Sequence, residues 1–171
     1  MSASAEMPYF IKPSVKVTEA QKEEFYVAAL SAIASTLEGE SDEWIKMVTI
    51  NALLKTHLPY FYWVGFYLYR EGQLVVGPYQ GTLGCLYIQM GQGVCGKAAT
   101  TQTTQIVGNV HLLEQGAEHI ACDPNSASEI VVPILRKDGS LLGVLDVDST
   151  LPDSFSALDA NFLGQMVQQH F

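Results

Sequence analysis

Hydrophobic positions in the first third of the chain recur at the spacing of an amphipathic helix. The apolar residues that set this spacing are Phe25, Ala28, Ala29, Ala32, Ile33 and Leu37. They predict a helix over about 19–37, which Thr18 and Gln21 begin as a capping box and Gly39 ends. A second helix is predicted over 41–57, because apolar residues again fall on one helical face.

From Pro59 the pattern changes to aromatic and β-branched runs separated by turn residues, which is typical of strands and hairpins. The predicted elements are a strand at 61–69 paired with one at 75–79, a short strand at 87–88, a helix at 93–101, a short strand at 105–107, a long irregular segment at 108–128, a hairpin of 130–135 and 141–147, and a last helix capped by Ser156. Irregular segments of that length inside a compact domain are usually functional.

This order of elements predicts an α+β fold in which an antiparallel sheet carries helices packed on one face. Residues 1–17 are expected to form an N-terminal arm. Residues 18–171 are expected to form one domain, because 171 residues suit a single core. The N-terminus lacks a secretory signal pattern, and no apolar run reaches membrane-spanning length. A cytoplasmic location is therefore expected.

The charge balance narrows the kinds of partner. Nine basic residues face eighteen acidic ones, which gives a net charge of −9. Such a field repels nucleic-acid backbones and anionic lipid surfaces, so we expect neither nucleic acid nor membrane as a partner. An acidic site would accept an ammonium group or a zwitterion.

The three cysteines are the strongest chemical clue, because each lies in a turn-prone stretch with small or polar neighbours. They are Cys85, Cys95 and Cys122. Cys95 follows a glycine turn at a predicted helix start, and the helix dipole there favours a thiolate, so this argument makes it the most acidic thiol. Free cysteines are also often plain buried hydrophobes. A zinc site formed with His119 is a weaker alternative, since no two of these ligands have the short spacing usual in structural zinc sites.

Carboxylates and aromatic residues complete the candidate site. Asp146 and Asp148 are two apart on a predicted strand and project from the same face, while Glu129 opens the partner strand. Convergent carboxylates bind a cation or share a proton, although these could also be exposed strand-end residues. Trp63 and Tyr67 share one face of the first strand, either in the core or along a pocket.

The motifs together resemble the free methionine-(R)-sulfoxide reductases, which are single-domain GAF enzymes. The resemblance covers about residues 20–170 and rests on residues 63–67 (WVGFY), 77–81 (GPYQG), Cys85, 91–96 (GQGVCG), 119–123 (HIACD), 128–133 (SEIVVP) and 143–149 (GVLDVDS). It implies a six-stranded antiparallel sheet, a homodimer, reduction of the free sulfoxide, and thioredoxin as reductant, with no cofactor.

Carried over residue by residue, the resemblance makes Cys122 the nucleophile and Cys85 the resolving thiol. It leaves the role of Cys95 open. It places Glu129, Asp146 and Asp148 in the active site as the carboxylates, and Trp63 and Tyr67 as its aromatic wall.

The implied chemistry agrees with the residue types. A carboxyl group with a raised pKa would protonate the departing oxygen, and a sulfenic acid on one thiol would condense with a second thiol. Carboxylates suit the substrate ammonium, and the backbone N–H groups of 91–93, including Gly93, suit its carboxylate. The rival from another class is a GAF module that senses a small molecule without catalysis. A third alternative is a redox-sensing protein whose thiols react with peroxide and do not turn over methionine sulfoxide. The Asn-Lys pair of cyclic-nucleotide-binding GAF domains is missing from the sequence.

Overall fold

The computed structural model describes residues 12–113 and 122–171. Along the chain the elements are α1 (Glu19–Thr36), α2 (Glu43–His57), β1 (Trp63–Arg70), β2 (Gln73–Gln80), β3 (Tyr87–Gln89), α3 (Gly93–Thr101), β4 (Gln105–Val107), the 3-10 turn η1 (Val110–Leu112), β5 (Ser128–Leu135), β6 (Leu141–Ser149) and α4 (Ala157–His170). These bounds confirm every predicted helix and strand to within a few residues. The capping boxes predicted at Thr18 and Ser156 are both present.

The strands form one antiparallel sheet in the order β3-β2-β1-β6-β5-β4. The long strands β1 and β6 lie at its centre, and β5 flanks β6. In the β5–β6 register, Glu129 is opposite Asp148 and Val131 is opposite Asp146. Because neighbouring side chains on one face of a sheet interact across the strands, this register brings the predicted carboxylates together.

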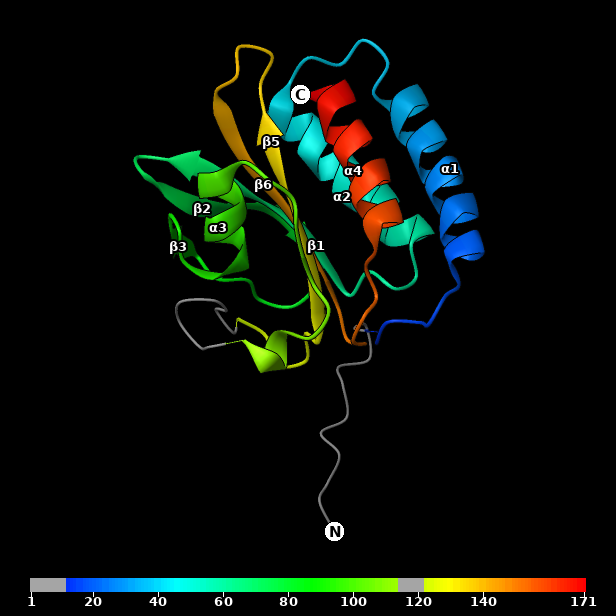
Figure 1. The fold of residues 1–171 in the computed structure, drawn as a ribbon. Coiled ribbons are helices and arrows are strands. Elements are labelled where there is room, and N and C mark those ends of the chain that lie inside the picture. Colours follow the sequence, from blue (N-terminus) through cyan, green and yellow to red (C-terminus); the bar gives the residue numbers. More distant parts are fainter. Residues whose placement is uncertain (1–11, 114–121) are drawn as a thin grey trace.

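The two faces of the sheet are covered differently, as Figure 1 shows. Helices α1, α2 and α4 pack on one face, where residues such as Phe66 and Leu145 meet Ile33 and Ile50 in the larger core. Helix α3 lies on the other face, against a smaller core that contains Trp63, Tyr67 and Val131. The prediction of helices on one face thus describes three helices, and α3 is the exception. Its position matters, because it encloses the candidate site.

A buried polar network links α1 to α4 at the far side of the molecule. The Asp159 carboxylate, fully buried, accepts hydrogen bonds from Lys22 Nζ at 2.8 Å, Tyr26 OH at 2.8 Å and Tyr60 OH at 2.5 Å. Buried charges are tolerated when they are paired and hydrogen-bonded in this way. The network fixes how the two helices sit on the sheet and lies apart from the α3 face.

Most of the predicted N-terminal arm lies outside the described residues. Its last part, residues 12–17, has no helix or strand, but Ser14 exchanges hydrogen bonds with Thr150 and donates to Tyr60 O. The boundary between arm and domain at residue 17 remains a prediction. Among the described helices, none is both long and apolar enough to cross a lipid bilayer.

Candidate functional site

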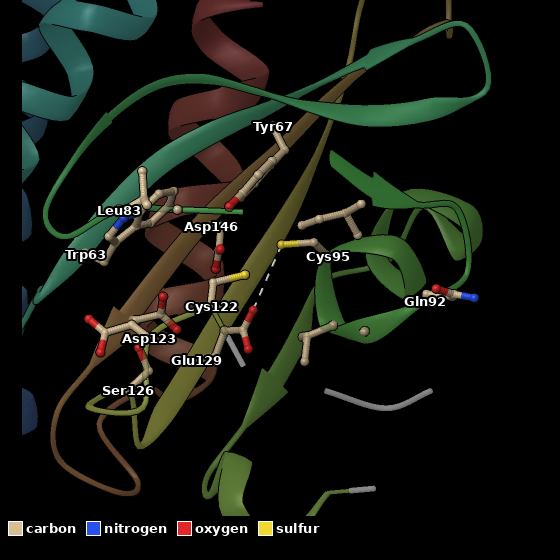
Figure 2. A pocket seen from close by; sticks show the side chains of 15 residues that line it. Trp63, Tyr67, Leu83, Gln92, Cys95, Cys122, Asp123, Ser126, Glu129 and Asp146 are labelled. Atoms are coloured by element: carbon tan, nitrogen blue, oxygen red, sulfur yellow. Dashed lines mark hydrogen bonds between the residues drawn. The ribbon is translucent and has the colours of Figure 1, made fainter. Parts of the chain in front are cut away.

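A pocket of about 510 Å³, including the part open to solvent, lies between α3 and the sheet. Figure 2 shows side chains from β1, α3, β5 and β6 converging on it. The residues that line it are Trp63, Tyr67, Leu83, Gly84, Ile88, Gln92, Gly93, Val94, Cys95, Cys122, Asp123, Ser126, Glu129, Asp146 and Asp148. Every predicted site residue except Cys85 is in this set, and Cys85 is bonded to a member of it.

Three carboxylates face the pocket from neighbouring strands. Glu129 and Asp146 are each only 6% exposed, so they are not the exposed strand-end acids of the alternative reading. Burial, together with the charges of Asp146 and Asp148, raises the pKa of Glu129 well above its usual value. Burial and the Asp146 charge likewise raise the pKa of Asp148. Burial raises the pKa of Asp146 to about 6, opposed by hydrogen bonds with Glu129 and Cys95.

One oxygen of this three-carboxylate cluster (Glu129, Asp146 and Asp148) is available to bind a ligand. The Oδ1 atom of Asp146 is buried and has no hydrogen-bond partner within the protein. A buried acceptor without a partner is costly, and such atoms usually mark the place of a ligand, ion or water. The cluster is therefore suited to receive a donor group such as an ammonium.

Cys95 lies on the first turn of α3, and its thiol is buried among the carboxylates. Its Sγ is 4.0 Å from Glu129 Oε1, the contact drawn as a dashed line in Figure 2. Burial, and after it the charges of Asp146, Glu129 and Asp148, raise the pKa of this thiol well above its usual value. The prediction that Cys95 is the most acidic thiol is therefore wrong. The helix dipole alone would lower its pKa, but burial and three nearby carboxylates have the larger, opposite effect.

Cys85 and Cys122 are joined by a disulfide, and Cys95 is the free cysteine. Their Cα atoms are 5.5 Å apart, the usual separation for such a bond. Of the two bonded residues, Cys122 is exposed and Cys85 is half-buried. This pairing leaves no room for a zinc site built on all three cysteines, and its proposed fourth ligand, His119, lies outside the described residues.

A stack of aromatic rings forms the wall of the pocket at β1. The Trp63 ring stacks on Tyr67 at a centroid distance of 5.9 Å and on Tyr79 at 5.0 Å. Trp63 and Tyr67 share one face of β1 while Phe66 lies in the other core, as the alternation predicts. The indole is tightly enclosed, because an added Cβ at Gly84 would be 3.0 Å from its ring. The wall is therefore fixed in place.

The start of α3 supplies backbone donors. The N–H groups of Gly91 and Gln92 already donate to Gly96 O and Gln89 O, so the prediction that all of residues 91–93 serve as donors is too broad. N–H groups in the first turn of a helix have no partner within the helix. Gly93 and Val94, which line the pocket, are thus the amides placed to bind an anion.

One group of donor atoms in the described part of the chain is compact enough to share a metal ion. The Cys95 sulfur and one oxygen each from Glu129 and Asp146 lie within 4.8 Å of one another, all buried. A cation there would have to displace protons, because the pKa values of all three groups are raised. The same raised values suit proton transfer.

Sequence reasoning missed several residues that shape the site. Leu83 and Ser126 line the pocket, and Asp123 lies beside Cys122 on its rim. The sequence signals for Asp123 were its place at the end of the 119–123 motif and in a turn-prone stretch after a cysteine. Nothing in the sequence marked Leu83.

Comparison with known proteins places the chain in a family. A model of the GAF domain matches residues 49–169. The GAF domain-containing protein A of Dictyostelium discoideum is 41% identical over 155 residues, which cover 90% of this chain and 95% of that protein. The free methionine-R-sulfoxide reductase of Escherichia coli is 38% identical over 148 residues, covering 86% of this chain and 87% of that enzyme.

A solved structure agrees with these relatives. The Staphylococcus aureus fRMsr in complex with substrate superposes with a TM-score of 0.79 at 37% identity, covering 91% of this chain and 95% of that one. The resemblance inferred from the motifs is confirmed. The chain belongs to the GAF-domain family and, within it, to the free methionine-R-sulfoxide reductases.

Proposed function

We propose that the protein reduces free methionine-(R)-sulfoxide to methionine in this pocket, with Cys122 as nucleophile and Cys85 as resolving thiol. One observation carries the proposal: Cys122, an exposed residue, lines the same pocket as three carboxylates whose pKa values are raised. A thiol beside carboxyl groups whose pKa values are raised is the combination that sulfoxide reduction requires, because such a group can donate a proton to the departing oxygen.

The chemistry runs in two steps. The Cys122 thiolate attacks the sulfoxide sulfur, and a carboxyl group of the cluster protonates the oxygen. The oxygen passes to Cys122, so methionine leaves and Cys122 becomes a sulfenic acid. Cys85 then attacks the sulfenic sulfur, water leaves, and the disulfide forms. The sulfoxide gains the two electrons that the thiol pair loses, which balances the reaction.

The pocket offers one contact for each part of a free amino acid. The Asp146 Oδ1 atom, which has no partner in the protein, accepts from the substrate ammonium. The first amides of α3, at Gly93 and Val94, receive the substrate carboxylate. Trp63 and Tyr67 pack against the S-methyl group, since sulfur and methyl groups contact aromatic rings favourably. Glu129 and Asp148, both with raised pKa values, are the candidate proton donors.

The disulfide must be reduced again after each turnover. An external dithiol serves this purpose, and we propose thioredoxin in the cytoplasm, with the protein acting as a homodimer and without a cofactor. The Cys95 thiol is buried and its pKa is raised, so we assign it no attack step in the first turnover. Its place beside Glu129 suits a role in holding the carboxylate cluster.

The test is release of methionine with dithiothreitol as reductant. We expect turnover of the free R epimer, and rates at least about a hundredfold lower with an N-acetylated, C-amidated R sulfoxide, because both charge contacts are then lost. The S epimer keeps both charges, but its oxygen and methyl group exchange places at the sulfur, so it should also react at least about a hundredfold more slowly. Equal rates on the blocked substrate would show that the ammonium and carboxylate contacts do not exist. Binding of the free sulfoxide without any methionine release would instead favour the sensing module.

A further inference from the structure

We infer that Thr82 and Asp123 form a clamp that holds the loops carrying Cys85 and Cys122 together while the disulfide is open. Thr82 is three residues before Cys85, and Asp123 directly follows Cys122. The Thr82 hydroxyl donates to Asp123 Oδ2 at 2.5 Å. This inference rests on the proposed function and assigns a positioning role to two residues outside the thiol chemistry.

Two consecutive residues, Trp63 at the start of β1 and Tyr62 just before it, anchor the two sides of the clamp. The Trp63 indole N–H donates to the backbone oxygen of Thr82 at 2.8 Å and so holds the Cys85 loop. The Tyr62 hydroxyl donates to Asp123 Oδ2 at 2.9 Å and so holds the Cys122 loop. Both loops are thereby fixed to the same point of the sheet. Tyr62 itself is tied to β6, since its N–H donates to Asp148 O at 2.8 Å.

The Asp123 carboxylate is built to accept these bonds in its charged form. Asn125 donates to Oδ1 from its backbone N–H at 2.8 Å and from its side-chain amide at 3.0 Å. Burial alone would raise the pKa of Asp123, but the hydrogen bonds from Thr82, Asn125 and Tyr62 together lower it. Asp123 is therefore favoured in its ionised form, whereas burial raises the pKa values of the cluster carboxylates. Hydrogen bonds to an ionised acceptor are the stronger kind.

The clamp matters only in the second step of the reaction. Condensation of the Cys122 sulfenic acid with Cys85 needs both sulfurs within bonding reach, although 37 residues separate them in the chain. Holding two reacting groups in place raises their effective concentration. The disulfide holds the loops only after it has formed. Before that, the loops are held by the anchors at Tyr62 and Trp63 and joined to each other by the Thr82–Asp123 hydrogen bond. The first step, attack on the sulfoxide, does not depend on Cys85.

The test separates the two steps in a single turnover of the reduced protein with one equivalent of the R sulfoxide. Methionine release is measured together with disulfide formation, by maleimide quenching and mass spectrometry, and dimedone traps the sulfenic acid. In Thr82→Val, methionine release should keep its native rate. Disulfide formation should slow about tenfold or more, the loss expected for one hydrogen bond to a charged group, and dimedone-labelled Cys122 should accumulate.

Thr82→Ser is the matched control, because it keeps the hydroxyl and loses only the methyl group. It should form the disulfide at nearly the native rate. Tyr62→Phe, which removes the other donor to the same oxygen, should also slow disulfide formation. Native disulfide formation in Thr82→Val, or equal slowing in Thr82→Ser, would overturn the clamp. Absence of methionine release from the native protein would instead refute the proposed function.

Discussion

Replacing Asp146 by Asn should stabilise the protein at alkaline pH, because the ionised Asp146 carboxylate is buried and destabilises the native fold. Its pKa is raised from 3.8 to about 6 by burial. A raised pKa means that the folded state binds the proton more tightly than the unfolded state does. The associated stability is present below pH 4 and is lost as the pH rises through about 6. A shift of this size corresponds to about 3 kcal/mol at pH 8.

The assay is urea unfolding of the fully reduced proteins, followed by tryptophan fluorescence between pH 4.5 and 8. Between pH 4.5 and 8 the native protein should lose about 2 kcal/mol of stability relative to Asp146→Asn, because about 1 kcal/mol of the full effect has already been lost at pH 4.5. The control is Glu24→Gln on the exposed surface of α1, which removes the same charge and should leave the native pH profile unchanged. If the free energies of unfolding of the native protein and Asp146→Asn stayed parallel across this pH range, burial would not be perturbing Asp146.

Other residues give further expectations. Glu129→Gln and Asp148→Asn should each slow methionine release about a hundredfold in a single turnover if that residue is the proton donor, and native rates in both would show that neither residue donates the proton. Asp159→Ala should lower the free energy of unfolding by about 3–5 kcal/mol, because the buried Lys22 ammonium then keeps only the exposed Glu19 as ion-pair partner. The hydroxyl groups of Tyr26 and Tyr60 also lose their buried acceptor. Asp159→Asn keeps the shape and should cost less; equal midpoints in urea for all three proteins would contradict the network.

The elements of this fold were readable from the sequence because their signals are local. The capping boxes at Thr18 and Ser156 and the glycine turns mark helix and strand ends directly. The alternation along β1 correctly separated Trp63 and Tyr67 from Phe66, since the side-chain period of a strand is two. The position of α3 was not readable, because the apolar spacing of a helix shows which side of the helix is buried but not which face of the sheet it covers.

The sequence predicted which residues form the candidate site better than it predicted the acidity of their side chains. Its residues came from the motifs, and the structure brings them to one pocket. The acidity assigned to Cys95 failed because the helix start is visible in the sequence, whereas the burial and the carboxylates come from strands far along the chain. The pairing of Cys85 with Cys122 could not be derived from spacing, and it was only implied by the resemblance. The Thr82–Asp123 contact joins residues 41 apart that no pattern connects.

The central claim is that Cys122 attacks the sulfoxide and Cys85 closes the disulfide. The most direct measurement is the methionine released in a single turnover without reductant by the native protein and by Cys122→Ser, Cys85→Ser and Cys95→Ser. We predict about one equivalent from all except Cys122→Ser, which should release none, with Cys85→Ser stopping at the sulfenic acid. A full equivalent from Cys122→Ser together with none from Cys95→Ser would contradict this assignment and make the buried thiol the nucleophile.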